Sequence, residues 1–529
     1  MMKVVVIGLD GATWNLIEPW AREGKLPNFQ RLMENGSWGT LKSVVPISTA
    51  PSWKCYSTGK NPGKLGAYFW YNFDRERKKI KMVNSTSFKS KEIWDYLSEE
   101  GYKCGVINMP TTYPPKQVNG FMISGFNALD NLDYTYPKDL KEELVRKYGY
   151  KVNPDHALRL NLLLGRDEAL KERDKGIAEI KEMIKTRFKV ARDLWDSEGL
   201  DFLHLTIFYI DNVQHYLWGA MDEEDPVYGR VLPEIWELID QEIGEFLQHL
   251  DEDTIVFIMS DHGFDRLKAR FKFNQWLYDK SYLKLKEKQG FSLSSLLYRL
   301  GVNTQRAYKL AHSRVGRSLV RLIPHSLVTK MWFLLRTSKD EVNIIDILDM
   351  VDWERTKAVM VGESLFFVNI EDPEEYERFR EKLIEEMKGV KDPETGEKIV
   401  AEARKSEEIY DTGYSIPDIL TVQTEGYGYD ISVSPSGDLW TYWFEDGYSA
   451  FHTMDGIFLA YGKGIKEGQK IHGSIYDLAP TILSLFGLSA PDMDGRTLKE
   501  IFNPDFEPNG SLDEKRKIKN TIESLKGKI

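Results

Sequence analysis

The stretch Lys3–Leu9, KVVVIGL, is apolar after its first residue and is followed at once by Asp10 and Gly11. Apolar residues at consecutive positions predict a strand that is buried on both faces of a largely parallel sheet. The G-x-G-x-x-G spacing of a dinucleotide-binding turn is absent after it. Because the run ends in an aspartate and not in a small-residue cleavage site, we interpret it as a first strand rather than a signal peptide. We therefore expect a cytoplasmic protein.

The same alternation of short apolar runs with longer amphipathic stretches continues along most of the chain. It is typical of an α/β fold, with helices on both faces of a largely parallel sheet. Helices are expected at 26–34, 167–196 and 232–250. The further strands that we expect lie at 103–108, 202–210, 254–260, 358–361, 364–369, 419–423 and 456–461.

Composition excludes several classes of protein. The chain has 529 residues, and its formal charge of -11 argues against a general nucleic-acid coat, which would be basic. No stretch reaches the roughly 18 uncharged apolar residues of a membrane span, so we do not expect a transmembrane protein. The two cysteines, Cys55 and Cys104, do not form a ligand cluster, and we interpret them as small buried residues.

One segment departs from this composition. Residues 284–339 contain a single acid, Glu287, and carry about +11 in a chain of net charge -11. We predict an inserted basic helical cap over 266–354, within a core made of 1–265 and 355–505. The core holds a second helical insert at about 128–196, and a peripheral helix follows at 506–529. Two interpretations of the cap stay open, namely a solvated helical hairpin and a lid that meets an anionic substrate or an anionic membrane surface.

Side chains that commonly bind metals follow several of the predicted strands. Because ligands in open α/β sheets bind outside the carboxyl ends of the strands, these positions are candidates for a site. Each one alone has an ordinary interpretation as a helix cap or a surface histidine. The candidates are Asp10, the pair Asp211 and His215, the pair Asp261 and His262, and His452.

Three aspartates and three histidines beside core strands suit a pair of divalent metal ions. Zinc fits nitrogen and carboxylate ligands most naturally, and manganese and iron also tolerate them. A metal pair can hold both the attacking and the leaving oxygen in the hydrolysis of a phosphate ester. The segment 45–53, VPISTAPSW, offers Ser48, Thr49 and Ser52 at a predicted helix start, where the helix dipole would favour an alkoxide. Without the metal residues, these hydroxyls would be an ordinary cap cluster.

These motifs, in this order, resemble the type I phosphodiesterase and nucleotide pyrophosphatase family of the alkaline phosphatase superfamily. The resemblance is closest to a prokaryotic branch with a GxDG start, here Gly8–Gly11. It rests further on a TAPxW segment at Thr49–Trp53 and a TGKNPGKxG loop at Thr58–Gly66. It extends to about Phe502 through IYDLAPTILSLFGL and PDMDGRTL. It implies an alkaline-phosphatase-like three-layer sandwich.

Residue by residue, the resemblance implies a two-metal hydrolase of phosphodiester or pyrophosphate-type bonds. Asp211, His215 and His452 would bind one metal ion. Asp10, Asp261 and His262 would bind the other, together with the hydroxyl of Thr49. Thr49 would be the nucleophile and would form a covalent phosphothreonine-type intermediate, which an activated water then hydrolyses. The substrate would be a small anionic phosphate ester.

The chain departs from the family pattern beside the nucleophile. Leu65-Gly66 stands where the family commonly has histidine-glycine. The asparagine that binds a phosphoryl oxygen in nucleotide pyrophosphatases would fall near Trp70, and the nearest one here is Asn72, our candidate oxyanion donor. The aromatic residues Trp53, Tyr68 and Phe69 could stack on a leaving group or pack in the core.

Other interpretations remain open within and outside the superfamily. Sulfatases need a cysteine or serine nucleophile, and alkaline phosphatases use serine, so Thr49 favours a diesterase. A phosphomonoesterase, and a phosphonate or lipid head-group hydrolase or transferase, remain as alternatives. A non-catalytic binding protein on the same fold is the interpretation we favour least, because no ligand is lost. The sequence does not indicate an oligomeric state.

Overall fold

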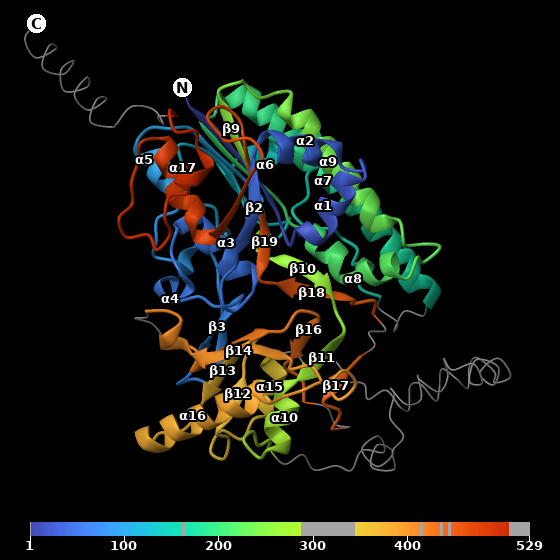
Figure 1. Ribbon diagram of the computed structural model, residues 1–529, viewed down its shortest axis with the longest axis vertical. Helices are drawn as coiled ribbons and strands as arrows, with labels where there is room; N and C mark the ends of the chain where they lie inside the picture. The colour runs from blue at the N-terminus through green and yellow to red at the C-terminus, as the bar shows by residue number, and fades with distance from the viewer. Residues whose placement is uncertain are drawn as a thin grey trace, which may run out of the picture.

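The computed structural model describes residues 2–160, 166–286, 344–411, 416–433, 437–442 and 446–506. Most of them build a part centred on a nine-stranded sheet, and the rest form a smaller part below it (Figure 1). Most of the predicted basic cap (287–343) and nearly all of the predicted terminal helix lie outside the described residues. Within the described residues, no helix combines the length and the apolar character needed to cross a bilayer.

The nine-stranded sheet has the order β20-β2-β19-β9-β1-β8-β5-β6-β7. Strand β1 (Lys3–Leu9) lies between β8 and β9 and is parallel to both. Strands β19 and β7 run antiparallel to their neighbours, so the sheet is largely parallel, as predicted. The other strands are β2 (Ser37–Lys42), β5 (Cys104–Ile107), β6 (Gly120–Ile123), β7 (Thr135–Tyr136), β8 (Phe202–Ile207), β9 (Thr254–Met259), β19 (Asp455–Tyr461) and β20 (Gln469–Ser474).

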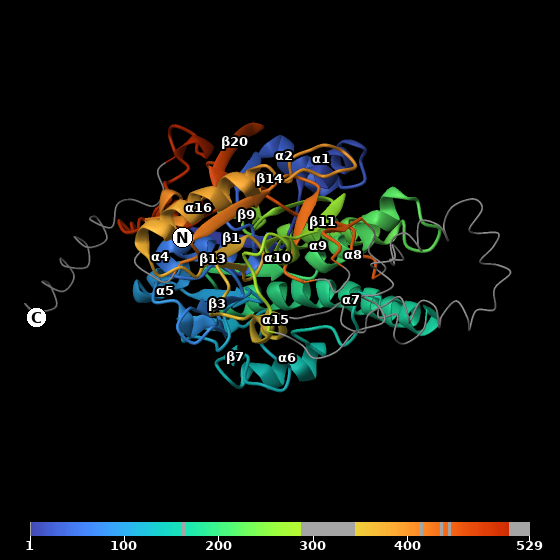
Figure 2. The ribbon, with the colours of Figure 1, turned by 90° about the horizontal axis from the view of Figure 1, so that it is seen from below.

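Alternate side chains of β1 pack into two different hydrophobic cores, one on each face of the sheet. The sheet is thus the middle of three layers, with helices on both sides. Val5, Ile7 and Leu9 pack with one set of helices, whereas Val4 and Val6 pack with the other. The two sets lie on opposite faces of the sheet (Figures 1 and 2). The first set is α1 (Trp14–Arg22), α2 (Pro27–Asn35), α6 (Leu140–Tyr148), α7 (Arg166–Glu198), α8 (Ile210–Asp222) and α9 (Val231–Leu247); the second is α3 (Thr49–Thr58), α5 (Ile93–Glu99) and α17 (Leu478–Leu485).

The strands expected at 358–361, 364–369 and 419–423 do not join this sheet. They form an antiparallel sheet of order β12-β13-β15-β14 with a hydrophobic core of its own. The link between β12 and β13 spans only four residues, which is too short for the crossover that parallel strands require. This part contains β12 (Ala358–Met360), β13 (Leu365–Val368), β14 (Val400–Lys405), β15 (Ile419–Gln423), α10 (Phe273–Asp279), α15 (Ile344–Met350) and α16 (Pro373–Lys388).

Short elements connect the two parts. Strand β10 (Gly263–Arg266) pairs with β18 (Ala450–Thr453), and β11 (Ala269–Lys272) continues into the smaller part between β16 (Tyr427–Asp430) and β17 (Trp440–Thr441). Helix α4 (Pro62–Leu65) and the hairpin of β3 (Tyr71–Asp74) and β4 (Lys79–Met82) follow α3. The division into 1–265 with 355–505 and a cap at 266–354 stays a prediction. The described residues on both sides of the gap at 287–343 belong to the core of the smaller part.

A buried ion pair fixes helix α3. Lys54 Nζ lies 2.7 Å from Glu92 Oε1, and both side chains are 1% exposed. Lys116 Nζ lies 2.6 Å from the other Glu92 oxygen. Burial works to raise the pKa of Glu92, but the two ammonium charges outweigh it and lower this pKa to about 2. The carboxylate of Glu92 is therefore charged, and it neutralises the buried ammonium group of Lys54.

Replacing Glu92 with glutamine should destabilise the protein by about 3–5 kcal/mol near neutral pH, because Lys54 would stay buried without its partner. The folded-state pKa of Glu92 lies below the ordinary value of 4.5, so its stabilisation is fully present above that pH. This stabilisation is lost as the pH falls toward 2, and urea unfolding at several pH values should show the two proteins converging. Glu76→Gln, at an exposed turn, should change stability by less than about 0.5 kcal/mol. Equal stability of Glu92→Gln and wild type at neutral pH would contradict the assignment.

Candidate metal and nucleophile site

Three adjacent parallel strands bring the predicted ligands to one edge of the sheet. Asp10 follows β1, Asp261 and His262 follow β9, and Asp211 lies in the first turn of the helix α8 that follows β8. Because β1 pairs with both β8 and β9, the three strand ends are neighbours. His452 reaches the same place from β18, which pairs with the segment after His262. The order of the strands therefore gathers residues that lie far apart in the sequence.

The first group of potential ligands is Asp211, His215 and His452. His215 Nε2 lies 3.4 Å from Asp211 Oδ2 and 3.1 Å from His452 Nε2. His452 Nε2 lies 3.1 Å from Asp211 Oδ1. His215 Nδ1 donates to the carbonyl oxygen of Ala450 at 2.8 Å, which directs the lone pair of Nε2 toward the other two residues. The three ligand atoms lie within 4.8 Å of one another, as a single metal ion requires.

The second group differs in one respect from the predicted set. Ligand atoms of Asp10, Asp211 and His262 lie within 4.8 Å of one another, so Asp211 borders both groups. Asp261, which the resemblance places here, has Oδ2 at 3.2 Å from His262 Nε2 and accepts the N–H of Gly11 on Oδ1 at 3.1 Å. All three aspartates are thus within reach of the histidines of this cluster.

Thr49 is the first residue of α3, and its side chain points into the second group. Its Oγ1 lies 3.3 Å from His262 Nε2, and the residue is 5% exposed. A helix N-terminus carries partial positive charge, which favours an anionic oxygen there. Ser43 connects this helix to a predicted ligand. Its hydroxyl donates to the backbone carbonyl of Asp261 at 2.6 Å and lies 3.0 Å from Oγ of Ser52, which is on α3.

The electrostatics of the cluster favour bound cations. Burial raises the pKa of Asp10 well above its ordinary value, and the charges of Asp261 and Asp211 add to this. Burial likewise raises the pKa of Asp261 to about 8. Burial also acts to raise the pKa of Asp211, but the neighbouring His215 and His452 lower it overall. Burial lowers the pKa of His215 to about 4, so this imidazole is neutral and has a lone pair to offer.

The residues present fit a pair of divalent metal ions. Asp10 Oδ1 and Asp261 Oδ2 are buried and have no hydrogen-bond partner among the described residues. A buried carboxylate oxygen without a partner is costly unless a cation contacts it. Nitrogen and carboxylate donors suit zinc, manganese or iron.

Trp53 and Tyr68, predicted as substrate contacts, lie in the interior instead. Trp53 is fully buried, and its indole N–H donates to Asp10 Oδ2 at 2.8 Å. Tyr68 is 2% exposed and belongs to the core of the smaller part. Neither ring has a free face for a ligand to stack on. Phe69 is partly buried and packs edge-on against Tyr71, with ring centroids 5.0 Å apart.

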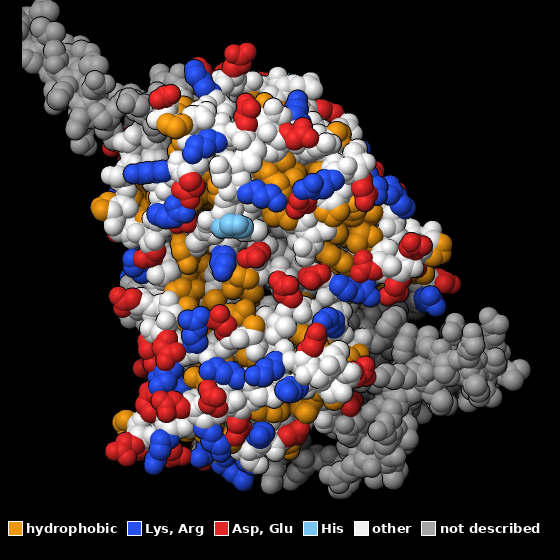
Figure 3. All heavy atoms as spheres, viewed as in Figure 1, with side chains coloured by type: hydrophobic (Ala, Val, Ile, Leu, Met, Phe, Trp, Pro, Cys, Tyr) orange, Lys and Arg blue, Asp and Glu red, His pale blue; other side chains and the backbone are white. Residues whose placement is uncertain are grey.

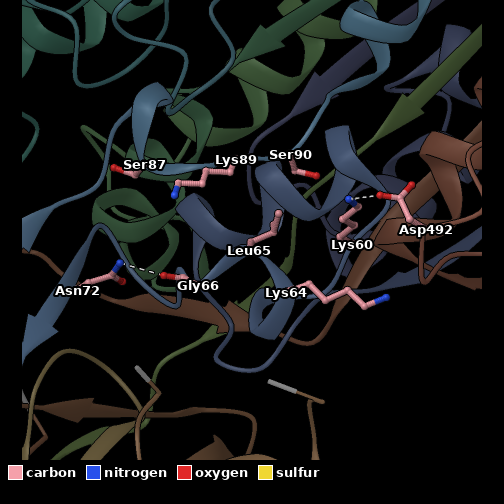
Figure 4. Close-up of a pocket in the computed structure, with 9 residues that line it drawn as sticks. All are labelled: Lys60, Lys64, Leu65, Gly66, Asn72, Ser87, Lys89, Ser90 and Asp492. Carbon is pink, nitrogen blue, oxygen red and sulfur yellow. Dashed lines mark hydrogen bonds and ion pairs between the residues drawn. The ribbon is translucent and has the colours of Figure 1, made fainter. Parts of the chain in front are cut away.

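Asn72 lies in a different place from the metal cluster. Its side-chain N–H donates to the carbonyl of Gly66 at 2.9 Å, and it lines a cavity of about 580 Å³ (Figure 4). Lys60, Lys64 and Lys89 line the same cavity, and Lys60 pairs with Asp492. None of the predicted metal ligands, and not Thr49, lines it. The oxyanion role of Asn72 thus gains no support from its position.

A larger cavity, of about 1130 Å³, adjoins the cluster at His452. It lies between strands β2 and β20 of the large sheet and β14 and β15 of the smaller one. On the face shown in Figure 3, the surface is hollowed between the two parts, and hydrophobic side chains lie among charged ones. Val45 and Ile47, which precede Thr49, also line this cavity. It has room for a substituent much larger than a phosphoryl group.

Two residues beside the cluster were missed by sequence reasoning. Tyr448 stacks on His215 with ring centroids 4.5 Å apart, and the guanidinium of Arg270 lies 5.1 Å from the centre of the Tyr448 ring. Both residues come from segments that connect the two parts. No motif or spacing in the sequence marks them, because only the folded chain brings them to His215.

A largely parallel sheet between two helical layers, with aspartates, histidines and a threonine at the carboxyl ends of its central strands, is an alkaline-phosphatase-like arrangement, and the family model that matches the chain is one of phosphoric ester hydrolases. The family model described as type I phosphodiesterase / nucleotide pyrophosphatase matches residues 4–445, and the chain belongs to that family. Membership implies dependence on divalent metal ions, and the two ligand groups could hold them.

Solved structures support the same fold. Human ectonucleotide pyrophosphatase/phosphodiesterase 5 is similar at a TM-score of 0.50 and 15% identity, covering 95% of this chain and 100% of that one. Phosphonoacetate hydrolase from Sinorhizobium meliloti 1021, in complex with phosphonoacetate, is similar at a TM-score of 0.55 and 12% identity. That match covers 90% of this chain and 94% of the other. A search of curated proteins finds none that matches this sequence.

Proposed function

We propose that the protein hydrolyses phosphodiester or pyrophosphate-type bonds in small anionic substrates, with Thr49 as nucleophile and two divalent metal ions. The observation that carries the proposal is the position of Thr49 Oγ1, 3.3 Å from His262 Nε2 within a largely buried cluster of three aspartates and three histidines. Asp211, His215 and His452 would hold one ion. The other ion would be held by Asp10, Asp261, His262 and Thr49. We expect both ions to be zinc.

The reaction would proceed in two displacements. Thr49 Oγ1 attacks phosphorus, the bond to the leaving oxygen breaks, and the leaving group departs with a proton. The product is a phosphoryl ester of Thr49, which water then cleaves with return of the hydroxyl. When bound, the two cations would offset the negative charge that develops on the phosphoryl oxygens. The chain itself contributes the helix N-terminus at Thr49, a residue that is 5% exposed.

The cavity beside His452 favours a diester over a monoester. A monoester presents one substituent, whereas a diester has a second group that needs space near the metal cluster. The cavity of about 1130 Å³ provides such space. Its lining mixes basic residues such as Lys42 with acidic ones such as Asp455, so it does not single out one type of substituent. The alternatives that remain are a phosphomonoesterase and a phosphonate or lipid head-group hydrolase or transferase.

The test is the ratio of kcat/KM for bis-p-nitrophenyl phosphate and p-nitrophenyl phosphate on metal-loaded protein. We expect the diester to be preferred by about tenfold or more, equivalent to about 1.4 kcal/mol of transition-state binding. A preference for the monoester would instead assign the protein to the phosphatases, with Thr49 in place of their serine. Phosphonoacetate as a third substrate would distinguish the phosphonate hydrolase, for which it should be turned over faster than both.

A further inference from the structure

Helix α3 carries two residues that face the metal cluster, one turn apart. Thr49 is the candidate nucleophile, and Trp53 lies four residues later, on the same side of the helix. Trp53 and Asp10 are both 0% exposed, and the indole N–H donates to Asp10 Oδ2 at 2.8 Å. The helix that positions the nucleophile is therefore bonded directly to a predicted metal ligand.

This hydrogen bond distinguishes the two oxygens of the Asp10 carboxylate. Oδ2 accepts from Trp53, whereas Oδ1 has no hydrogen-bond partner among the described residues and lies 3.8 Å from His262 Nε2. A carboxylate with one oxygen held in this way presents the other in a fixed direction. Oδ1 is thus the oxygen available to a cation.

The indole ring itself is held in place by the first strand. A Cβ atom at Gly8 would lie 2.3 Å from the Cη2 atom of Trp53, so the ring packs directly against the backbone of β1. Trp53 also packs edge-on against Tyr56, with ring centroids 5.9 Å apart. The ring therefore cannot swing away from Asp10 without displacing the core around it.

We infer that Trp53 is a positioning residue for the metal site. Its indole N–H fixes the orientation of Asp10 so that Oδ1 faces the cation of the second group, and it couples that ligand to the helix that carries Thr49. The inference rests on the proposed function, because it assigns Trp53 a role toward a metal ion. A tryptophan suits this position because its large apolar ring fills the core and carries an N–H donor.

The test is the affinity of Trp53→Phe for zinc, measured by competition with a chromophoric chelator. Phenylalanine keeps an aromatic ring in the core but removes the donor. We expect one of the two zinc sites to weaken by about 10–100-fold and the other to stay near wild type. The matched control is Trp236→Phe in α9, which removes a buried indole N–H that has no hydrogen-bond partner among the described residues. That variant should bind both ions as wild type does.

A second variant controls for loss of packing or folding in Trp53→Phe. Incorporation of 3-benzothienylalanine at position 53 replaces the N–H by sulfur and keeps the shape of the ring. A double-mutant cycle with Asp10→Ala, which removes the acceptor of the indole N–H, adds a readout that loss of packing would not move. If Trp53 acts through Asp10, removing its donor should weaken zinc binding much less in the Asp10→Ala background than in wild type.

The outcomes separate the inference from the proposed function. If wild type binds two zinc ions and the folded position-53 variants bind them equally well, the inference is wrong and the proposed function stands. If wild type itself binds no zinc, manganese or iron, the proposed function fails and the inference fails with it. Weaker binding at one site only, with the Trp236→Phe control unchanged, supports the inference.

Discussion

Replacing Thr49 with alanine should lower the turnover of a phosphodiester by about a thousandfold or more. The hydroxyl at this position is the only group we assign to attack on phosphorus, and it lies 3.3 Å from His262 Nε2. The metal content should stay near wild type, because the aspartates and histidines of both groups remain. Steady-state kinetics on metal-loaded protein, with metal analysis of the same samples, would measure both quantities.

Two further variants define what this result means. Thr49→Ser keeps a hydroxyl on the same atom and should retain much of the activity. Ser48→Ala removes the neighbouring hydroxyl, which makes no capping hydrogen bond to α3. This variant should change turnover only a few-fold. Normal turnover in Thr49→Ala would show that the covalent mechanism is wrong.

Removing the metal ions should abolish turnover and also destabilise the fold. Without cations, burial and the charges of neighbouring aspartates raise the pKa values of Asp10 and Asp261, so the charged form of each carboxyl group is disfavoured. At a free metal concentration 1,000 times the dissociation constant, each bound ion should add about 4 kcal/mol to the free energy of unfolding. Thermal unfolding and turnover before and after chelation, followed by return of zinc, manganese or iron, would show the effect and identify the preferred metal.

A pair of aspartate variants localises this effect. Asp261→Asn should lower both metal content and turnover, because Asp261 Oδ2 is a buried carboxylate oxygen of the cluster without a hydrogen-bond partner among the described residues. Asp265→Asn, on β10, removes a partly buried carboxylate whose Oδ1 accepts from the backbone of Arg266, and should leave metal content unchanged. Full activity in demonstrably metal-free protein would contradict the two-metal account.

The central sheet was predictable because its strands carry an unmistakable pattern. The runs at β1 and β9 are almost entirely apolar, and β8 is interrupted by His204 and Thr206, as expected of strands that are covered on both faces. The residues Asp10, Asp211 and Asp261 stand directly beyond those runs, so a parallel sheet brings them together whatever the details of the loops. His452 could be included because it precedes another such run.

The parts that escaped prediction depend on contacts between distant segments. Nothing in the sequence around Trp53 distinguishes a ring that stacks on a ligand from one that donates to Asp10. The runs of β12 and β13 were predicted as strands, but nothing in those runs indicates that they join β15 and β14 in a separate antiparallel sheet. Asn72 was predicted only as the asparagine nearest to the family position at Trp70, and in the structure it lines another cavity.

The most direct test of the account is to trap the proposed ester on Thr49. Wild-type protein mixed with bis-p-nitrophenyl phosphate and quenched in acid within the first turnover would be digested and analysed by mass spectrometry. We predict that the peptide containing Thr49 carries a p-nitrophenyl phosphoryl group, with one p-nitrophenol released per modified chain. Rapid turnover with Thr49 unmodified, or with the group on another residue, would contradict the assignment of Thr49 as the nucleophile.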